Sequence, residues 1–175
     1  MPMQIRPVDP LQEPAIKDVV CAAFGSEVEY ELVEALRAEE DVWVPEWSLG
    51  AYIDGELAGH ILFTRAWAGS KLAALLAPLA VSPVNQNTGV GQALIEAGLS
   101  AARAEGAELS LVLGHPDYYP KGGFEPAMPH GILAPYPINP PEAWMVIELV
   151  EGALVDAAGV VKVAEALGAP ELWRE

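Results

Sequence analysis

Apolar residues recur at alternating or helical spacing along the first part of the chain, and this pattern predicts its elements. We expect a short strand at 3–8 and a first helix over 13–25, where apolar residues return every three or four positions. A second helix is expected over 27–39, with Ser26 as its N-terminal cap. The N-terminal part is therefore predicted to be one strand followed by two helices.

The middle of the chain is predicted to be mostly sheet. An Asp-Gly pair, which suits a tight two-residue turn, separates apolar runs at 48–54 and 56–67 and predicts a β-hairpin. A buried strand is expected at 75–81, an amphipathic helix over 89–105 and an apolar strand at 108–114. Strand, helix and strand in close succession form a βαβ unit, so the two strands should be parallel and joined by a right-handed crossover.

The last third of the sequence is less regular. A proline-rich segment at 126–141 is expected to be ordered coil, because it carries residues that can pack, namely Ile132, Leu133, Tyr136 and Ile138. A further strand is predicted at 143–150. The tail is expected to hold a short hairpin strand at 160–163 and a weak helix. Together these elements predict a mixed α/β fold.

Length and composition favour one soluble domain. The chain has 175 residues, of which 52% are hydrophobic and 19% charged, and this composition argues against a disordered chain. We expect a single domain over 1–175, with a core at about 3–150 and an extension at 151–175. The longest apolar run, 72–81, contains a proline and is too short to span a bilayer, and no cleavable leader is evident. A cytoplasmic protein with no membrane partner is therefore expected.

Charge and residue types argue against two kinds of partner. The formal net charge of −16, from 25 acidic and 9 basic residues, repels phosphate backbones, so no nucleic-acid partner is expected. The same charge favours a cationic substrate, although solubility explains it equally well. One cysteine, Cys21, and 3 scattered histidines offer no metal-ligand spacing, so no metal is expected. His60 is expected to be structural.

The stretch Gln86-Asn87-Thr88-Gly89-Val90-Gly91 lies between the buried strand and the amphipathic helix. A helix N-terminus presents unpaired N–H groups and a partial positive charge, which suits a phosphate, and glycines let a ligand approach the backbone. The loop lacks the Gly-Lys-Ser/Thr ending of a Walker loop, and Leu94 stands where a dinucleotide fingerprint has its third glycine. On spacing alone, a structural connector is the commoner explanation.

The neighbouring residues resemble the GNAT superfamily of acyl-CoA-dependent N-acetyltransferases, closest to its YhbS-like bacterial branch. The family signature Gln/Arg-x-x-Gly-x-Gly/Ala is matched by residues 86–91, and a second landmark, Tyr-x-x-x-Gly-Phe, by residues 119–124. The resemblance covers most of residues 3–150 and implies a central mixed sheet with splayed parallel strands, flanked by helices. Pro78, which cannot donate to a strand ladder, fits such a splay, although a simple bulge would also explain it.

The resemblance also implies acetyl-CoA, or another short acyl-CoA, as cosubstrate. The N–H groups of the loop would wrap the pyrophosphate, and the pantetheine arm would pair with the preceding strand. The implied cofactor-binding residues are Leu79, Ala80, Val81, Gln86, Asn87, Thr88, Gly89, Val90, Gly91 and Gln92. Among them, the N–H groups of Leu79 and Ala80 would stabilise the tetrahedral oxyanion, a contribution of roughly 3 kcal/mol per donor in well-studied enzymes.

Tyr119, the tyrosine of the second landmark, is implied as the catalytic acid. A phenol stays protonated at neutral pH and can donate its proton as the thiolate forms. Alternatively, the Tyr119 ring packs on the core and only hydrogen-bonds the cofactor sulfur; Tyr118 is expected to pack. No general base is identifiable, because the glutamates at 27, 29, 31 and 34 border the implied acceptor cleft but also fit a solvated helix face. His115, at a strand end, is a weaker candidate for ligand contact.

The activity implied by these features is transfer of an acetyl or short acyl group from acyl-CoA to a primary amine, by direct attack in a ternary complex. The acceptor, a small-molecule or peptide amine, is not identified by the sequence. Two other interpretations stay open: a non-catalytic acyl-CoA-binding or regulatory module, and a structural homo-oligomer in which the loop only turns the chain. The oligomeric state is likewise open, and a homodimer is compatible with the sequence.

Overall fold

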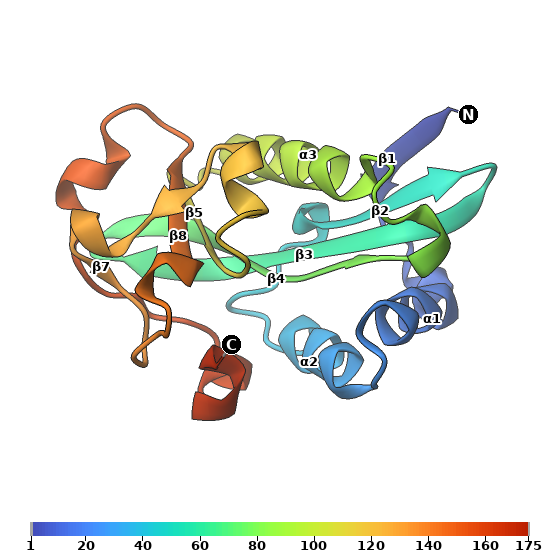
Figure 1. The fold of residues 1–175 in the computed structure, drawn as a ribbon, viewed down its shortest axis with the longest axis horizontal. Coiled ribbons are helices and arrows are strands. Elements are labelled where there is room, and N and C mark those ends of the chain that lie inside the picture. The colour runs from blue at the N-terminus through green and yellow to red at the C-terminus, as the bar shows by residue number, and fades with distance from the viewer. Residues whose placement is uncertain (1, 175) are drawn as a thin grey trace.

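A computed structural model describes residues 2–174 and shows a central sheet with helices on both faces (Figure 1). The helices and strands, in chain order, are β1 (Met3–Pro7), α1 (Glu13–Phe24), α2 (Val28–Arg37), β2 (Ser48–Ile53), β3 (Glu56–Ala68), β4 (Lys71–Val81), α3 (Val90–Ala104), β5 (Leu109–Leu113), β6 (Glu125–Pro126), β7 (Ile132–Leu133), β8 (Trp144–Glu148) and β9 (Gly159–Val160). Short 3₁₀ turns connect them: η1 (Pro10–Gln12), η2 (Pro45–Trp47), η3 (Pro83–Asn85), η4 (Tyr119–Gly122), η5 (Met128–His130), η6 (Pro141–Ala143), η7 (Ala153–Asp156), η8 (Glu165–Leu167) and η9 (Pro170–Trp173).

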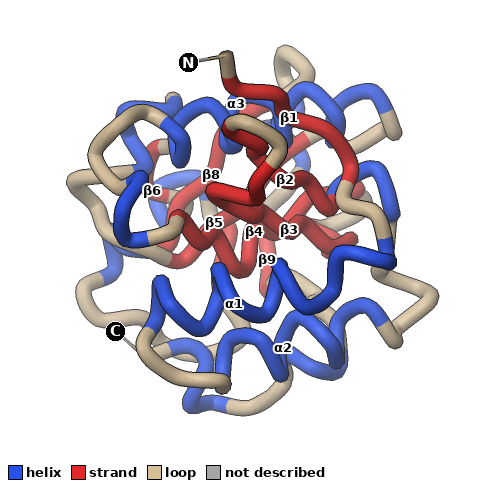
Figure 2. The backbone as a smooth tube through the Cα atoms, turned by 90° about the vertical axis from the view of Figure 1, so that its right-hand side faces the viewer, coloured by secondary structure: helices blue, strands red, loops and turns tan. Residues whose placement is uncertain are grey.

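Seven strands form the main sheet in the order β1-β2-β3-β4-β5-β8-β6, and β7 pairs with β9 in a second, two-stranded sheet. Neighbours in the main sheet are antiparallel except β4 and β5, which are parallel and joined through α3. Figure 2 shows α3 on one face of the sheet and α1 with α2 on the other. The predicted mixed α/β fold and its βαβ unit are therefore confirmed.

The first hairpin forms where the Asp-Gly pair predicted it. Asp54 and Gly55 have φ values of 53° and 80°, the left-handed conformation that a tight turn between twisted strands requires. The next turn, between β3 and β4, was not predicted. It contains Gly69 with φ 60°, and it lets β4 begin at Lys71, earlier than the predicted strand at 75–81.

Strands β4 and β5 diverge halfway along β4. Their pairing ends at Leu76 opposite Val112, whereas β4 stays paired to β3 as far as Val81. Between Leu76 and Leu79 the register of β4 shifts against β3, so that Ala77 and Pro78 together oppose one residue, a β-bulge. Pro78 thus lies both in a bulge and at the splay, and the two explanations offered for it are not exclusive.

The core has a layer on each face of the sheet. On the α3 face, Phe63 of β3 packs so closely on the helix that a Cβ at Gly98 would lie 2.2 Å from the ring. On the opposite face, Val33 and Leu36 of α2 are fully buried against the sheet. The tail adds to this second layer through Ala153, Ala157, Val161, Ala164, Leu167 and Trp173.

Three local predictions were wrong. Ser26 does not cap α2; its hydroxyl donates to the Glu29 carboxylate at 2.9 Å, because Glu27 occupies the N-cap position. The tail strand is not part of a hairpin, since β9 pairs in parallel with β7, and 3₁₀ turns replace the predicted helix. Leu133 was expected to pack but is exposed. Within the described residues, no helix is long and apolar enough to cross a membrane.

Candidate active site

A cleft of about 1060 Å³ opens where β4 and β5 part. Its walls include the diverging strands, the loop of residues 86–92 and the segment around η4. Its far end is formed by the junction of α1 and α2 together with the C-terminal residues 171, 172 and 174. The cleft is therefore continuous from the first turn of α3 to the opposite face of the sheet.

Backbone groups of β4 point into this gap. The Ser82 N–H donates to the Ala58 carbonyl on the β3 side at 2.8 Å. Because backbone direction alternates along a strand, Ala80 also points toward β3, whereas Leu79 and Val81 point to the side that β5 has left. The side chain of Gln86 agrees with this, since its amide nitrogen lies 3.2 Å from the outward carbonyl of Val81.

The loop after β4 offers a row of backbone donors at the start of α3. Asn87 and Gly89 have φ values of 61° and 91°, and this left-handed backbone leads directly into the helix. In the described part of the chain, no carbonyl or side chain accepts a hydrogen bond from the N–H groups of residues 86–92; the first such bond is from Ala93 to Gly89. A helix N-terminus with unpaired donors suits an anion such as a phosphate.

The two signature glycines have different surroundings. A Cβ at Gly89 would meet no atom within 4 Å, so its glycine is required by the positive φ alone. A Cβ at Gly91 would instead lie 2.1 Å from the Tyr118 hydroxyl, which therefore sits over the first turn of α3. Burial raises the pKa of Tyr118, so its hydroxyl remains a hydrogen-bond donor beside this turn.

Tyr119 also lines the cleft and is held by packing. Its ring lies against the end of β5, where a Cβ at Gly114 would be 2.2 Å from the ring edge. Its ring centroid is 5.2 Å from that of Tyr118 and 5.9 Å from that of Phe124, both in T-shaped arrangements. Tyr119 thus contacts both the core and the cleft, which is compatible with either role given to it.

The structure brings most of the predicted site residues to one cleft. Its walls include the predicted residues Leu79, Val81, Gln86, Asn87, Gly89, Gly91, Gln92 and Tyr119. Three others have side chains elsewhere: Ala80 packs toward α1, Val90 packs from α3 into the core, and the Thr88 hydroxyl donates to the Asn85 carbonyl. For Thr88 and Val90, backbone contacts with a ligand remain a prediction. The backbone of Ala80 faces β3 instead, so the prediction that its N–H stabilises the oxyanion does not fit the structure.

Of the four candidate glutamates, only Glu29 lines the cleft; Glu27 instead pairs with Lys17 at 3.5 Å. His115 lies exposed on the cleft wall. The sequence reasoning missed Phe24, Val28 and the C-terminal segment as cleft residues. Nothing in their spacing marks them, because the tail reaches the cleft only through the fold.

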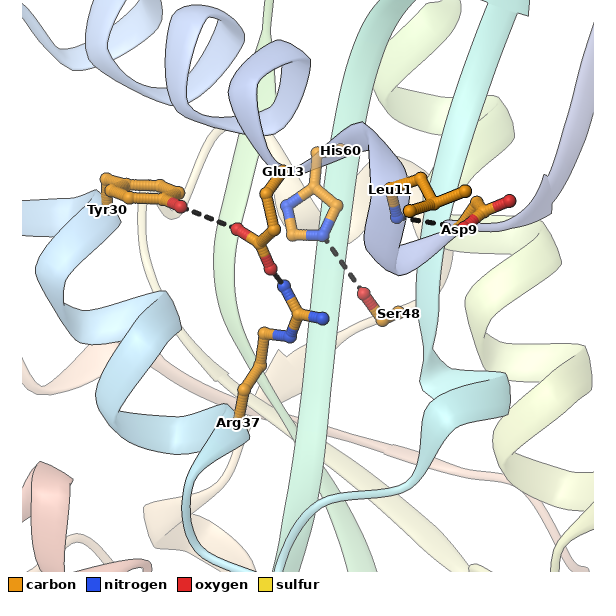
Figure 3. A network of polar contacts seen from close by, with 7 residues as sticks. All are labelled: Asp9, Leu11, Glu13, Tyr30, Arg37, Ser48 and His60. Carbon is orange, nitrogen blue, oxygen red and sulfur yellow. Dashed lines mark hydrogen bonds and ion pairs between the residues drawn. The ribbon is translucent and has the colours of Figure 1, made fainter.

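His60 is buried and belongs to a network of polar contacts around the start of α1 and the end of α2 (Figure 3). Its Nε2 lies 3.2 Å from the Ser48 hydroxyl, and burial, reinforced by the positive charge of Arg37, lowers its pKa to about 4. Arg37 of α2 forms an ion pair with Glu13 of α1, which also accepts a hydrogen bond from Tyr30. The Arg37–Glu13 and Tyr30–Glu13 contacts therefore join α1 to α2.

Comparison with known proteins identifies the family to which the chain belongs. A family model for the acetyltransferase (GNAT) domain matches residues 4–127. The chain belongs to the GNAT acetyltransferase family. YjhQ of Escherichia coli, an uncharacterized N-acetyltransferase, is 46% identical over 128 residues, covering 70% of each chain. YhbS of the same organism, also an uncharacterized N-acetyltransferase, is 28% identical over 171 residues, covering 93% of this chain and 97% of the relative.

Solved structures of GNAT acetyltransferases are also similar to this GNAT acyltransferase. The crystal structure of Escherichia coli YhbS in complex with CoA superposes with a TM-score of 0.87 at 27% identity, covering 96% of this chain and 93% of that one. A GNAT acetyltransferase from Brucella melitensis, in complex with acetyl-CoA, gives a TM-score of 0.75 at 29% identity, covering 95% and 98%. In residues 2–174, no group of three or more histidine, cysteine, aspartate or glutamate side chains could hold a metal ion.

Proposed function

We propose that this GNAT protein transfers an acetyl or short acyl group from acyl-CoA to a primary amine within a ternary complex. The observation that carries the proposal is the divergence of β4 from β5 beside the unpaired N–H groups of residues 86–92. This arrangement offers strand-like pairing to an extended ligand and a cluster of donors to an anion at its end. The similar structures in complex with CoA and acetyl-CoA support the same ligand here.

The backbone directions suggest how the cosubstrate lies. The pyrophosphate is placed at residues 86–92, and Lys121, which also lines the cleft, adds a positive charge for phosphate. The pantetheine arm is placed along the outward backbone groups of Leu79 and Val81. Alternation then favours the N–H of Leu79 over that of Ala80 as the donor to the thioester oxygen, where one such donor contributes roughly 3 kcal/mol.

The chemistry requires a neutral amine and a proton for the sulfur. The amine nitrogen attacks the thioester carbonyl, a C–N bond forms, the C–S bond breaks, and the thiolate takes the phenolic proton of Tyr119. The phenolate regains a proton released by the amine nitrogen, so the protein returns to its starting state. No covalent enzyme intermediate is part of this proposal.

We also propose that residues 151–175 belong to the same domain as the rest of the chain. The apolar side chains that the tail adds to the core support this.

Thiol release from acetyl-CoA, measured over a panel of amines with mass spectrometry of the products, tests this function. We expect amine-dependent thiol release and a product heavier than the amine by one acetyl group. The Tyr119→Phe variant serves as the matched low-activity sample. Binding of CoA without turnover on any amine or peptide would refute the transfer reaction and favour a binding module instead.

A further inference from the structure

The far end of the cleft is built by two segments distant in sequence. The junction of α1 and α2 supplies Phe24, Val28 and Glu29, and the C-terminal segment supplies Glu171, Leu172 and Arg174. Figure 1 shows both segments on the sheet face opposite α3. The family model matches residues 4–127, so it includes the α1–α2 part of this wall but not the part formed by residues 171, 172 and 174.

Apolar side chains lie in solvent at this end. Phe24 is 43% exposed and Val28 57% exposed, whereas α1 buries Ile16, Val19 and Val20 and α2 buries Tyr30, Val33 and Leu36. Leu172 of η9 lies on the same cleft. Exposed apolar side chains that line one end of a cleft mark a place where an apolar ligand group can bind.

A carboxylate accompanies these apolar groups. The Ser26 hydroxyl donates to Oε2 of Glu29 at 2.9 Å and so fixes the side chain in the first turn of α2. Within residues 2–174, Oε1 of Glu29 accepts no hydrogen bond and forms no ion pair. Glu29 is half-buried, so an ammonium group that reaches Oε1 would meet an oriented carboxylate partly removed from water.

The C-terminal wall is held firmly in place. The carboxylate of Glu39, just beyond α2, accepts hydrogen bonds from the N–H groups of Glu165 and Ala166 at 3.0 and 2.6 Å. Trp173 is buried, donates from its indole nitrogen to the Leu167 carbonyl at 2.7 Å, and packs on Trp144 with ring centroids 5.5 Å apart. Leu172 is therefore presented from a fixed segment.

We propose that this end binds the acceptor, and that the acceptor is a monoamine carrying an apolar group; the inference rests on the proposed acyl transfer. The amine arrives as an ammonium at Glu29 and gives one proton to solvent, so that the neutral nitrogen can attack the thioester, and its apolar group lies against Phe24 and Leu172. Arg174 disfavours a second positive charge on the acceptor, while Glu171 adds to the attraction of the first. The negative charge of the whole chain supports a cationic substrate but does not place it.

Calorimetry with three amines tests the proposal on the full chain, free and saturated with CoA. The amines are phenethylamine, ethanolamine, which lacks the apolar group, and spermidine, which carries several charges. We expect phenethylamine to bind at least about tenfold more tightly than either of the others. Glu29→Gln should weaken its binding about tenfold, and the matched variant Glu31→Gln, in the same helical turn but outside the cleft, should leave it unchanged.

A second variant checks the apolar wall. Leu172→Ala should weaken phenethylamine binding and leave ethanolamine binding unaltered. Tighter binding of spermidine, or equal effects of Glu29→Gln and Glu31→Gln, would overturn the inference. Glu29-dependent binding without acetylated product would support the acceptor site and refute the transfer reaction. Acetylation that is insensitive to Glu29→Gln would support the transfer reaction and refute the acceptor site.

Discussion

The Tyr118 hydroxyl lies over Gly91 so closely that a Cβ on this glycine would stand 2.1 Å from it. Gly91 is the last residue of the family signature, and ligand approach is the usual reason for such a glycine. Here the Tyr118 hydroxyl of the same protein occupies the space that a Cβ would take. The first turn of α3 and the tyrosine pair are therefore coupled, and this coupling can be measured.

Gly91→Ala should cost about 1 kcal/mol of unfolding free energy, because the added methyl group pushes the Tyr118 ring away. In a Tyr118→Phe background the nearest ring atom is the Cζ at 3.4 Å, so the same substitution should cost little. Urea unfolding of the wild type, both single variants and the double variant gives the coupling energy. An equal cost of Gly91→Ala in both backgrounds would show that the hydroxyl does not restrain this position.

Tyr119→Phe should lower kcat about 100-fold and leave the Kd for CoA nearly unchanged, since the lost proton is needed only as the thiolate leaves. Tyr118→Phe is the matched control, because it removes the hydroxyl of the adjacent ring. Steady-state kinetics with the best amine measures the effect of each variant on kcat, and calorimetry measures its effect on the Kd for CoA. Full activity of Tyr119→Phe would remove the acid role and leave Tyr119 as a packing residue.

His60 should make stability depend on pH. Its pKa in the folded protein, about 4, lies below the value of about 6.5 expected when unfolded, because its burial beside Arg37 disfavours the charged ring. The unfolded chain therefore binds more protons between these values, so stability is complete above about pH 6.5 and falls as the pH drops toward 4. The loss should reach about 3 kcal/mol.

Urea unfolding of the wild type and of His60→Gln at several pH values between 4 and 7 measures this contribution. The variant should be destabilised at pH 7 but should show a smaller loss on acidification. Parallel curves for the two proteins would mean that other groups cause the acid sensitivity.

Much of the fold could be predicted because its signals are local. The Asp54-Gly55 turn, the glycines that begin α3 and the apolar strands around it need only neighbouring residues to be recognised. The early start of β4 at Lys71 was missed because the turn before it is marked only by one glycine, Gly69, and a single glycine does not by itself predict a turn. The 3₁₀ turns of the tail were missed because tertiary packing of Leu167 and Trp173, not helical periodicity, determines them.

The candidate site, like the fold, could be predicted where its residues form a local motif. Residues 86–91 and Tyr119 form sequence motifs, and the structure brings most of them to one cleft. Leu172 and Phe24 carry no motif, and they line the same cleft because the tail packs on the sheet face that carries α1 and α2. The apolar wall of the proposed acceptor end therefore required the structure, whereas Glu29 was already a candidate from the sequence and the proposed cosubstrate end followed from its motifs.

The most direct measurement of the central claim compares CoA binding by Gly89→Asp and Gly106→Asp. These glycines lie at opposite ends of α3 with φ values of 91° and 94°, and a Cβ at either would meet no atom within 4 Å, so the backbone strain is matched. At Gly89 the new carboxylate would repel the pyrophosphate and compete for the N–H groups of residues 86–92. Isothermal calorimetry should show at least about a tenfold weaker Kd for CoA in Gly89→Asp and an unchanged Kd in Gly106→Asp. Equal affinities in the two variants would contradict the placement of acyl-CoA at this loop.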